Sequence, residues 1–367
     1  MSIQLKNNIQ LLDVMLSGLK VGKMALTPDR LCAFEYDADY LRYGISISPF
    51  YLPIQPGVFV AKRDPFNGNF GVFNDSLPDG WGSLILDRYL KEQGIDPRSL
   101  SLIERLSLIG KTGRGGLEYI PDNSVLKPEE IVNIDLLANQ AAKILELDYS
   151  GDSLEQLYRY AGSSGGARPK VFVTMNGEDW LIKFKASNDP DNVGEIEYNY
   201  SLLAKECGID MPETMLFEGK YFGVKRFDRE INKKYHVISA AGLLHADYRI
   251  PSLDYSMLLT ACFKLTRNIE EVYKLFRQMV FNVLIKNRDD HAKNFSFLLK
   301  DNTWQLSPAY DLLPGGGFNG YHTTTINGKG NPTENDIFAV ADSVGLNKQR
   351  TREIYLELSN TCRQISI

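Results

Sequence analysis

The amino-acid sequence predicts an α+β protein with a β-rich lobe, an all-helical lobe after it, and an N-terminal accessory α/β subdomain before both. Length is the first reason, because 367 residues at about 150 per domain correspond to two or three domains. Short runs of strand-forming residues separated by turn residues occur up to about residue 226. Beyond about residue 240, apolar residues recur with the spacing of helices.

The N-terminal subdomain is expected to contain a small sheet followed by helices. Turn residues interrupt the β-rich runs from Leu11 to about Pro65, which predicts short strands. Pro78-Asp79-Gly80 is a strong turn signal directly before a helical run, and a glycine-rich segment, Gly110–Gly116, ends the next helix. The expected elements are strands at Leu12–Leu16 and Val21–Leu26 and helices at Ser83–Leu90 and Ser99–Ile109.

The β-rich lobe is expected to begin with a charged helix at 127–146. A loop-like stretch, Tyr158–Arg168, then precedes two strand candidates that flank Asn176-Gly177, the strongest short hairpin signal. The glycines of that stretch therefore lead straight into a hairpin. The expected strands are Val171–Met175, Trp180–Lys185, Glu213–Phe217 and Tyr221–Arg226, with a helix from about Gly194 to Glu206.

The helical lobe contains the clearest amphipathic pattern of the chain, at 271–286, which predicts a core helix. Its end runs into a polar segment, Asn287–Asn294, which cannot be buried without partners. The apolar positions of the helix are Val272, Leu275, Phe276, Met279 and Val283. The other expected elements are a hairpin of Phe295–Leu299 and Trp304–Leu306 and helices at Glu334–Val344 and Gln349–Cys362.

We expect these elements to form three domains. Residues 1–125 would be the accessory subdomain, 126–241 the β-rich lobe, and 242–367 the helical lobe. The Gly-rich loop and Lys183 then belong to the β-rich lobe, and the polar segment after the core helix belongs to the helical lobe.

Composition excludes several classes of protein. The 41 basic and 46 acidic residues give a net charge of −5, so no overall positive field attracts nucleic acid. The four cysteines are scattered without a Cys-x-x-Cys pair, which argues against a zinc site or a disulfide framework. The N-terminus lacks the pattern of a secretory signal, and apolar stretches fall far short of the ~20 residues that span a bilayer. We expect a cytoplasmic protein without membrane contact.

The glycine-rich stretch before the hairpin offers one part of a nucleotide-phosphate site. Phosphoryl transfer needs a backbone cradle for phosphates, a lysine, magnesium-binding oxygens, and an aspartate that orients the nucleophile. Gly165, Gly166 and Ala167 would present amide N–H groups, because glycine permits close approach, and Lys170 follows them. Such a segment by itself is more often a plain turn, so its interpretation depends on the rest of the chain.

Lys183 occupies a central position in a mostly apolar strand, where an inward ammonium needs a partner. Glu197 on the following helix is the candidate, and it would form the lysine–glutamate ion pair with which kinases aim a lysine at phosphate oxygens. Glu195 is the competing choice. The alternative is an exposed lysine on an edge strand, with both glutamates on a solvated helix face.

The five-residue spacing of Asp289 and Asn294 is that of the kinase catalytic loop, Asp-x-x-x-x-Asn. It places an acceptor for the hydroxyl proton and a magnesium-binding amide on one compact loop. Chance gives this spacing roughly once or twice in such a chain, so position decides. The pair follows the core helix, and Asp311 arrives after a hairpin, where a kinase would place its second metal-binding residue. One carboxylate, one amide and phosphates suffice for Mg²⁺, which keeps several waters.

His291 lies between Asp289 and Asn294 and has two interpretations. A neutral imidazole could hydrogen-bond the loop or a phosphate, or the histidine could be purely structural. The other three histidines show no metal-ligand spacing, and no Gly-x-Ser-x-Gly elbow is present. Cysteine–histidine and serine-elbow chemistry are therefore not favoured.

Four motifs in this order resemble those of the HipA-like serine/threonine kinases, the toxin component of bacterial toxin–antitoxin pairs. They are Phe73-Asn74-Asp75-Ser76-Leu77-Pro78-Asp79-Gly80-Trp81-Gly82, Gly165-Gly166-Ala167-Arg168-Pro169-Lys170, Asp289-Asp290-His291-Ala292-Lys293-Asn294 and Tyr310-Asp311. The resemblance spans nearly the whole chain. It implies a two-lobed protein-kinase-like fold that uses ATP and Mg²⁺.

The resemblance also implies a role for each matching residue. Asp289 would be the catalytic base, and Asn294 and Asp311 would hold Mg²⁺. Lys183 would contact the ATP phosphates together with the glycine-rich loop, and the backbone at 239–241 would meet adenine. The implied ATP contacts are Ser164, Gly165, Gly166, Ala167, Arg168, Lys170, Lys183, Ser239, Ala240, Ala241 and His291.

Two features concern regulation and variation within the family. A serine just before the glycines is autophosphorylated in the family, which expels the loop and silences the enzyme. Ser163 aligns with that serine, and the neighbouring Ser164 is the alternative. The residue after the catalytic aspartate is often glycine in the family and is Asp290 here, a variant that we expect to be compatible with activity.

The resulting hypothesis is an ATP- and Mg²⁺-dependent serine/threonine protein kinase that acts as a toxin. By resemblance, its substrate would be a translation factor such as an aminoacyl-tRNA synthetase. A small helix-turn-helix antitoxin similar to HipB would bind it and supply most of the positive charge that DNA binding needs. One alternative is a small-molecule kinase of the aminoglycoside or choline type, which shares the Asp-x-x-x-x-Asn loop. The other is a catalytically silent co-repressor that binds the antitoxin.

Overall fold

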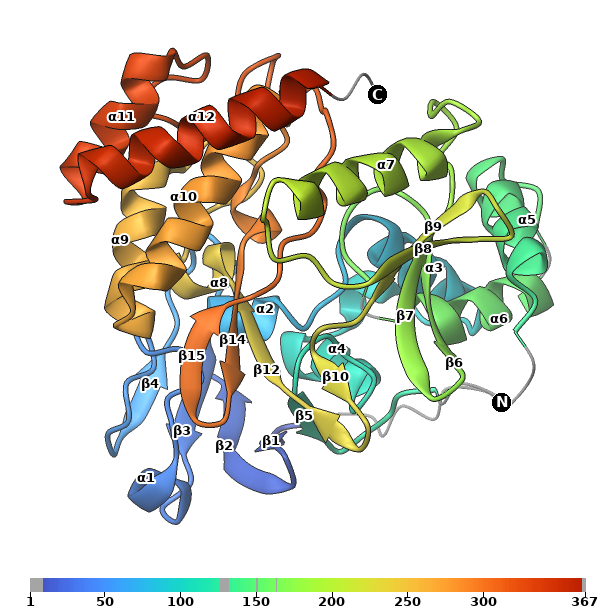
Figure 1. Cartoon of the computed structure of the whole chain (residues 1–367). Coiled ribbons are helices and arrows are strands. Elements are labelled where there is room, and N and C mark those ends of the chain that lie inside the picture. The colour runs from blue at the N-terminus through green and yellow to red at the C-terminus, as the bar shows by residue number, and fades with distance from the viewer. Residues whose placement is uncertain (1–8, 126–131, 150, 163, 365–367) are drawn as a thin grey trace. The chain divides into compact units, whose positions relative to one another are not determined.

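A computed structural model describes residues 9–125, 132–149, 151–162 and 164–364 of the chain. The chain divides into two compact units. The first unit combines residues 1–195 with 214–236, and the second combines 196–213 with 237–367. Both contain helices and strands, which confirms the α+β class (Figure 1). The finer division at residues 125 and 241 stays a prediction.

The N-terminal part of the first unit is built on a five-stranded antiparallel sheet, with the strand order β4-β3-β2-β1-β5. Leu12 and Val14 are fully buried and Asp13 between them is not, which is the alternation of a strand with one core face. The strands are β1 (Leu12–Leu16), β2 (Leu19–Leu26), β3 (Cys32–Tyr36), β4 (Val58–Val60) and β5 (Leu117–Ile120). The helices are α1 (Tyr40–Tyr43), α2 (Gly71–Asn74), α3 (Gly80–Glu92), the 3-10 turn η1 (Pro97–Ser99) and α4 (Leu102–Ile109).

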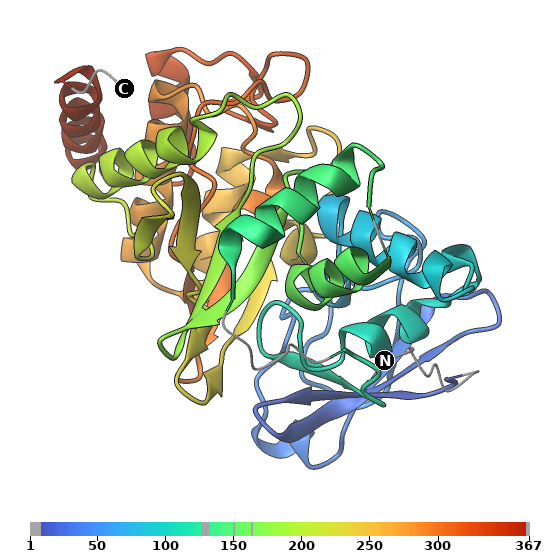
Figure 2. The same ribbon diagram turned by 90° about the vertical axis from the view of Figure 1, so that its right-hand side faces the viewer.

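The second sheet of the first unit has the order β6-β7-β9-β8 and is antiparallel throughout. Asn176 and Gly177 both have positive φ and join β6 to β7, as the hairpin signal predicted. Helix α6 packs against both α3 and α5 (Figure 2). The elements are α5 (Ile134–Leu145), α6 (Gly151–Ala161), β6 (Lys170–Met175), β7 (Glu178–Lys183), β8 (Thr214–Phe217), β9 (Tyr221–Lys225), β10 (Arg229–Glu230) and β11 (Lys233–Lys234).

One hydrophobic core joins the N-terminal part to this second sheet. Trp81 and Leu86 of α3 are buried in the same cluster as Leu157 of α6 and Val171 and Ile182 of the sheet. Burial of each large apolar side chain contributes about 1.5–3 kcal/mol. The N-terminal residues and the hairpin that follows the glycine-rich loop are therefore packed as one body.

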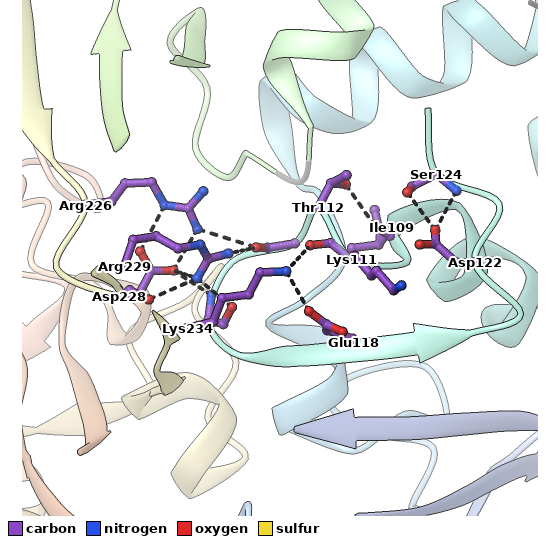
Figure 3. Close-up of polar contacts among 12 residues, drawn as sticks. Ile109, Lys111, Thr112, Glu118, Asp122, Ser124, Arg226, Asp228, Arg229 and Lys234 are labelled. Carbon is purple, nitrogen blue, oxygen red and sulfur yellow. Dashed lines mark hydrogen bonds and ion pairs between the residues drawn. The ribbon is translucent and has the colours of Figure 1, made fainter. Parts of the chain in front are cut away.

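A buried charge cluster fixes the glycine-rich segment Gly110–Gly116 to the same body (Figure 3). The Asp228 carboxylate lies 2.7 Å from Arg226 Nη2 and 2.9 Å from Arg229 Nη1, and it accepts the Gly115 N–H at 2.7 Å. Arg229 also donates to the Gly113 carbonyl at 2.7 Å. Burial opposes ionisation of Asp228, but the two guanidinium groups outweigh it and hold its pKa well below the usual range.

The second unit is mainly helical, and its core helix forms as the sequence predicted. Val272, Leu275, Phe276 and Met279 are buried on α10, which packs against α9 and α12 (Figure 1). The helices are α8 (Ala240–Leu244), α9 (Tyr255–Thr266), α10 (Ile269–Leu284), the 3-10 turn η2 (Ala292–Asn294), α11 (Glu334–Ser343) and α12 (Lys348–Gln364). Helix α7 (Val193–Glu206) begins in the first unit and continues in the second.

The expectation that this lobe is all-helical is wrong in detail. A three-stranded sheet, β12-β14-β15, and a parallel pair, β13 with β16, accompany the helices. The hairpin of β14 and β15 was predicted, but β12 is too short and too uniformly buried to show strand alternation. The strands are β12 (His236–Ser239), β13 (Leu253–Asp254), β14 (Ser296–Lys300), β15 (Thr303–Leu306) and β16 (Thr324–Thr325).

Two other boundaries differ from the sequence prediction. The stretch expected to be loop from Tyr158 is helical to Ala161, because buried Leu154, Leu157 and Ala161 follow helical spacing. The helix expected from residue 127 begins at Ile134, where the Asn133 side chain caps it; residues 126–131 lie outside the described ranges. Within those ranges, no helix is long and apolar enough to cross a membrane.

Candidate active site

The glycine-rich loop that precedes β6 is held by a segment nearly 90 residues earlier in the chain. Gly166 donates its N–H to the Asp79 carboxylate, and the Gly166 carbonyl accepts the Trp81 N–H at 2.8 Å. Trp81 also donates its indole N–H to the Lys170 carbonyl at 3.1 Å. Both ends of the loop are therefore fixed by the start of helix α3.

Two lysines of the predicted phosphate site face the same side of the hairpin. Lys170 and Lys183 are directly opposite each other in the β6–β7 pairing, and opposite residues of an antiparallel pair share a face. The Lys170 ammonium donates to the Gly165 carbonyl at 2.5 Å, and Lys183 Nζ lies 5.5 Å from the centre of the Phe222 ring. Like charges placed opposite each other repel, so this face is suited to an anion.

Arg168 closes the loop on its other side through a bidentate ion pair with Asp189. The Nε and Nη2 groups each lie 2.9 Å from a carboxylate oxygen, and Asp189 also accepts the Ala186 N–H at 3.0 Å. Burial opposes ionisation of Asp189, but Arg168 outweighs it and lowers its pKa. Arg168 therefore anchors the loop, and its predicted role as a direct ATP contact stays a prediction.

The two candidate phosphorylation sites differ in what can be described. Ser164 is 1% exposed, and its hydroxyl has no hydrogen-bond partner among the described residues. Ser163, the first choice from the sequence, lies outside the described residues. The choice between them stays a prediction.

In the second unit, the polar segment after α10 is organised around the fully buried carboxylate of Asp290. This carboxylate accepts hydrogen bonds from two side chains and two backbone amides. Burial, with the neighbouring carboxylate, raises the pKa of Tyr255 well above its usual range, so its hydroxyl stays a donor. The donors are Tyr255 Oη at 3.0 Å, His322 Nδ1 at 2.9 Å, Thr323 N at 2.9 Å and Thr324 N at 3.2 Å.

This buried anchor leaves the preceding residue, Asp289, exposed. Asn294 donates its side-chain amide to the Asp289 carbonyl at 2.7 Å, and its backbone N–H bonds the His291 carbonyl at 2.8 Å. The loop is thus closed on itself over the predicted Asp-x-x-x-x-Asn spacing. Because the amide nitrogen of Asn294 is used, its oxygen is the atom assigned to a ligand.

Buried amides connect this loop to Asp311. Asn287 donates to the Asp311 carbonyl at 3.1 Å and to Asn282 Oδ1 at 3.0 Å, and Asn282 donates to Tyr255 Oη at 3.0 Å. Asp311 has a φ of 55°, which is uncommon for a residue other than glycine. The chain of hydrogen bonds runs from the backbone of Asp311 through Tyr255 to Asp290.

A second connection comes from the residue before Asp311. The Tyr310 hydroxyl donates to the Lys293 carbonyl at 2.7 Å and lies 2.5 Å from the Ser296 hydroxyl. Asp311 is therefore held beside the 289–294 loop from two directions. The structure therefore holds the backbone of Asp311 beside the loop that carries Asp289 and Asn294, and the joint role of the three side chains stays a prediction.

The donor set fits magnesium better than a transition metal. It contains the Asn294 amide oxygen and the Asp311 carboxylate, and hard oxygen ligands are those that Mg²⁺ prefers. Within the described ranges, no group of three or more His, Cys, Asp or Glu side chains is arranged to hold a metal ion. Phosphate oxygens and water would have to complete the coordination.

His291 begins the 3-10 turn of the loop, and its Nδ1 accepts the Lys293 N–H at 3.2 Å. This bond within the loop is of the kind that the first interpretation describes, and it leaves Nε2 for a nucleotide contact, which stays a prediction. Ser239, Ala240 and Ala241 are buried, and Ala240 N–H donates to the Phe295 carbonyl at 2.8 Å. The Ala240 N–H is therefore already bound within the second unit. The adenine contact at 239–241 stays a prediction.

Glu197 is 4% exposed on α7, which removes the solvated-face alternative for this residue, whereas Glu195 is exposed. Lys183 and Glu197 belong to different compact units, and their ion pair stays a prediction.

Several residues that shape the loops were not found from the sequence. Asp290 was noted only as a departure from a glycine, although a buried carboxylate that anchors two amides is a strong structural signal. Asn287 begins the polar segment that was expected to need partners, and Asn282 lies in the last turn of α10. They bond each other, and their other partners, Asp311 and Tyr255, lie 24 and 27 positions away. The other missed residues are Tyr255, His322, Thr323 and Thr324.

Comparison with known families supplies the context for this geometry. A family model, the HipA-like C-terminal domain, matches residues 162–365, which is more than half of the chain. The chain belongs to the HipA family. A second model, the HipA N-terminal domain, matches residues 12–120 of this HipA-like chain. Both the glycine-rich loop and the 289–294 loop lie within the HipA-like C-terminal match.

Individual proteins agree with this assignment. The HipA-like chain is 25% identical over 332 residues to "Putative kinase Y4dM" of Sinorhizobium fredii, covering 83% of this chain and 77% of that protein. It is 22% identical over 346 residues to the serine/threonine-protein kinase toxin HipA of Shewanella oneidensis, covering 82% and 74%. HipA in the solved complex of HipA, HipB and operator DNA from Shewanella oneidensis has the same fold, with a TM-score of 0.70 at 18% identity over 96% of this chain and 89% of that one.

Proposed function

We propose that this HipA-like chain is a serine/threonine protein kinase that transfers the γ-phosphate of ATP with the help of Mg²⁺. The main support is that Asp289, Asn294 and Asp311 belong to two loops of the second unit that hydrogen bonds join to each other. An aspartate base and two oxygen ligands on adjoining loops are what phosphoryl transfer requires of a protein. The matched relatives that are named as kinases support the same reaction class.

In this proposal each group has one task. The exposed Asp289 carboxylate accepts the proton of the attacking hydroxyl, for which a fixed backbone and an accessible side chain are both necessary. Asn294 Oδ1 and the Asp311 carboxylate hold Mg²⁺, which neutralises charge on the phosphates when it is bound. Lys170 and Lys183 supply positive charge on one face of the first unit, beside the loop, in which Asp79 holds the Gly166 N–H.

We also propose the regulation that the family resemblance implies. Phosphorylation at Ser163 or Ser164 would add about −2 charge next in sequence to the glycines, one of which donates its N–H to the Asp79 carboxylate. Repulsion and the size of the phosphate would displace the loop. The hydroxyl of Ser164 is buried and has no hydrogen-bond partner in the described part of the chain, and it must leave its present position before it can be a substrate.

The proposed partner is a small helix-turn-helix antitoxin similar to HipB. The relative of known structure was solved with HipB and its operator DNA. The chain described here carries a net charge of −5, so in such an assembly the partner would supply most of the positive surface for DNA. The proposed role is that of the toxin, with a protein of the translation machinery, such as an aminoacyl-tRNA synthetase, as the substrate.

Labelled phosphate transfer tests the kinase proposal. Wild type, Asp289→Asn and Asp311→Asn are incubated with γ-labelled ATP and Mg²⁺, and phosphoprotein is measured alone and in a bacterial lysate. Loss of the base should lower the rate by about 10²–10⁴-fold. Asp301→Asn is the matched control, because Asp301 is an exposed aspartate in the β14–β15 turn. Equal labelling in all four proteins would refute the proposal, and label on metabolites alone would indicate a small-molecule kinase.

A further inference from the structure

The turn Pro78–Gly82 is a feature that the proposed chemistry does not use. It lies at the start of α3 in the N-terminal part of the chain, yet its contacts are with the glycine-rich loop. Asp79 and Trp81 both bind Gly166. The Asp79 carboxylate accepts the Gly166 N–H, and the Trp81 N–H donates to the Gly166 carbonyl at 2.8 Å. A peptide segment held at both its donor and its acceptor cannot rotate without breaking one bond.

The turn and the loop also touch through their backbones. A Cβ atom on Gly80 would lie 2.3 Å from the Gly166 carbonyl oxygen, and one on Gly82 would lie 2.3 Å from the Ser164 carbonyl oxygen. Gly80 also has a φ of 43°, in the left-handed region that favours glycine. Close approach at both Gly80 and Gly82 means that the loop lies directly on the turn, with its backbone shape set by that surface.

A glycine-rich loop without such support would be costly to order. Fixing the backbone of one residue costs about 1–2 kcal/mol of conformational entropy, and glycine loses more than other residues. Gly165, Gly166 and Ala167 are exposed, so core packing does not order their side of the loop. Contacts that order the loop before a ligand arrives remove this cost from binding.

We propose that the Pro78–Gly82 turn is a positioning element that holds the glycine-rich loop in its phosphate-accepting shape, with Asp79 as the positioning residue. This inference rests on the proposed nucleotide site. It includes the N-terminal region in that site, because residues at the start of α3 would determine the conformation of the loop. Asp79 itself carries negative charge, so its contribution comes from fixing Gly166 and not from contact with phosphate.

The test compares two substitutions at one position. Asp79→Ala removes the acceptor of the Gly166 N–H, whereas Asp79→Asn keeps an oxygen that can accept it. The control is Asp87→Ala on the same helix, where the carboxylate pairs with Arg105 at 3.3 Å. Hydrogen–deuterium exchange of the peptide 160–172 is measured without nucleotide, and the KM for ATP and kcat are measured with Mg²⁺. Thermal unfolding verifies that each variant is folded.

A positioning role predicts a specific pattern. In Asp79→Ala, amide exchange in 160–172 becomes faster, and the KM for ATP rises by about tenfold with a smaller change in kcat, the effect of one charge-assisted hydrogen bond. Asp79→Asn restores both to within about twofold of wild type, and Asp87→Ala changes neither. Gly80→Ala, which pushes on the Gly166 carbonyl, shifts exchange in the same direction as Asp79→Ala.

Two results would overturn the inference. Unchanged exchange and unchanged KM in Asp79→Ala would mean that the turn does not order the loop. Tighter ATP binding by Asp79→Ala would mean that the carboxylate competes with phosphate for the Gly166 N–H. If the wild type bound no ATP, the proposed function would fail, and the exchange measured without nucleotide would still decide whether the turn holds the loop.

Discussion

The two loops assigned to catalysis are stabilised in opposite ways. The 289–294 loop of the second unit is built over a fully buried carboxylate, Asp290, which binds two side chains and two backbone amides. The glycine-rich loop of the first unit has exposed residues at Gly165–Ala167 and is held by separate contacts: hydrogen bonds from the 79–81 turn, the Lys170 bond to Gly165 and the Arg168–Asp189 ion pair.

This difference separates a loop that must stay fixed from a loop that can be released. Removing a buried, multiply bonded carboxylate destabilises the whole fold, so the 289–294 loop moves only with its unit. Breaking a few partly exposed hydrogen bonds costs much less, because water can replace them. A loop of the second kind is suited to regulation, and the candidate phosphorylated serines are next to it.

The largest expected effect comes from Asp290→Ala. It leaves the Tyr255 hydroxyl, His322 and two backbone amides without their buried acceptor, so we expect unfolding free energy to fall by about 3–5 kcal/mol. Urea denaturation measures the change. Asp289→Asn is the matched control, since its exposed neighbour should change stability by less than about 0.5 kcal/mol. Equal effects at the two positions would contradict the contrast.

A comparable test within the first unit is Asp228→Ala. This carboxylate is buried between Arg226 and Arg229, and it accepts the Gly115 N–H. Loss of the acceptor leaves two buried guanidinium groups unpaired, so we expect about 3 kcal/mol of destabilisation. Faster hydrogen exchange should extend over 110–116 and leave 160–172 nearly unchanged. Exchange that rises equally in 110–116 and in 160–172 would show that the two glycine-rich segments are not held separately.

His236 makes the first unit sensitive to acid. Its ring nitrogen Nε2 lies 2.7 Å from the Ile47 carbonyl, and burial lowers its pKa to about 4. Unfolded histidine has a pKa near 6.5, so as pH falls the unfolded chain gains a proton that the folded chain does not, and stability decreases from about pH 6.5 down to about pH 4.

Between pH 7.5 and pH 5 this loss should be about 2 kcal/mol. Urea denaturation at both pH values measures it, and His236→Gln, which keeps a donor for Ile47 and does not titrate, should lack this component. The same pH dependence in wild type and variant would assign the acid sensitivity to other groups.

The smallest effect expected is that of Asn287→Ala. It removes two hydrogen bonds, to Asn282 and to the Asp311 carbonyl, and should cost about 1–2 kcal/mol of stability. Because Asp311 loses a hydrogen bond to its backbone carbonyl, the Mg²⁺ concentration needed for half-maximal phosphate transfer should rise. A loss of stability without any change in this Mg²⁺ dependence would mean that the Asn287 bond does not position Asp311.

Local signals in the sequence were enough to predict most of the helices and strands. The Asn176-Gly177 turn, the helical spacing from Val272 to Met279 and the hairpin after Asn294 all depend on neighbouring residues, and all were confirmed. The description of the last lobe as all-helical did not fit the β14–β15 hairpin that the sequence itself predicted. Strand β12, which pairs with β14, was missed because it is short and buried on both faces. Patterns of alternation carry no information about such a strand.

The supports of the site could not be predicted for a different reason. Asp290 bonds residues 32–35 positions away along the chain, and Asp79 bonds Gly166, 87 positions away. Sequence spacing identified Asp289 and Asn294, because their geometry is local. It gave no means of pairing Asp290 with Tyr255, since that contact depends on how helices and loops pack.

The most direct measurement of the central claim is mass spectrometry of the purified protein after incubation with ATP, with Mg²⁺ or with a chelator. We expect added phosphate on Ser163 or Ser164 in the presence of Mg²⁺, and strongly reduced phosphate with the chelator or in Asp289→Asn. Phosphate that appears equally in Asp289→Asn or without Mg²⁺, or a wild type that neither gains phosphate nor transfers it to another protein, would contradict the assignment of a kinase site to Asp289, Asn294 and Asp311.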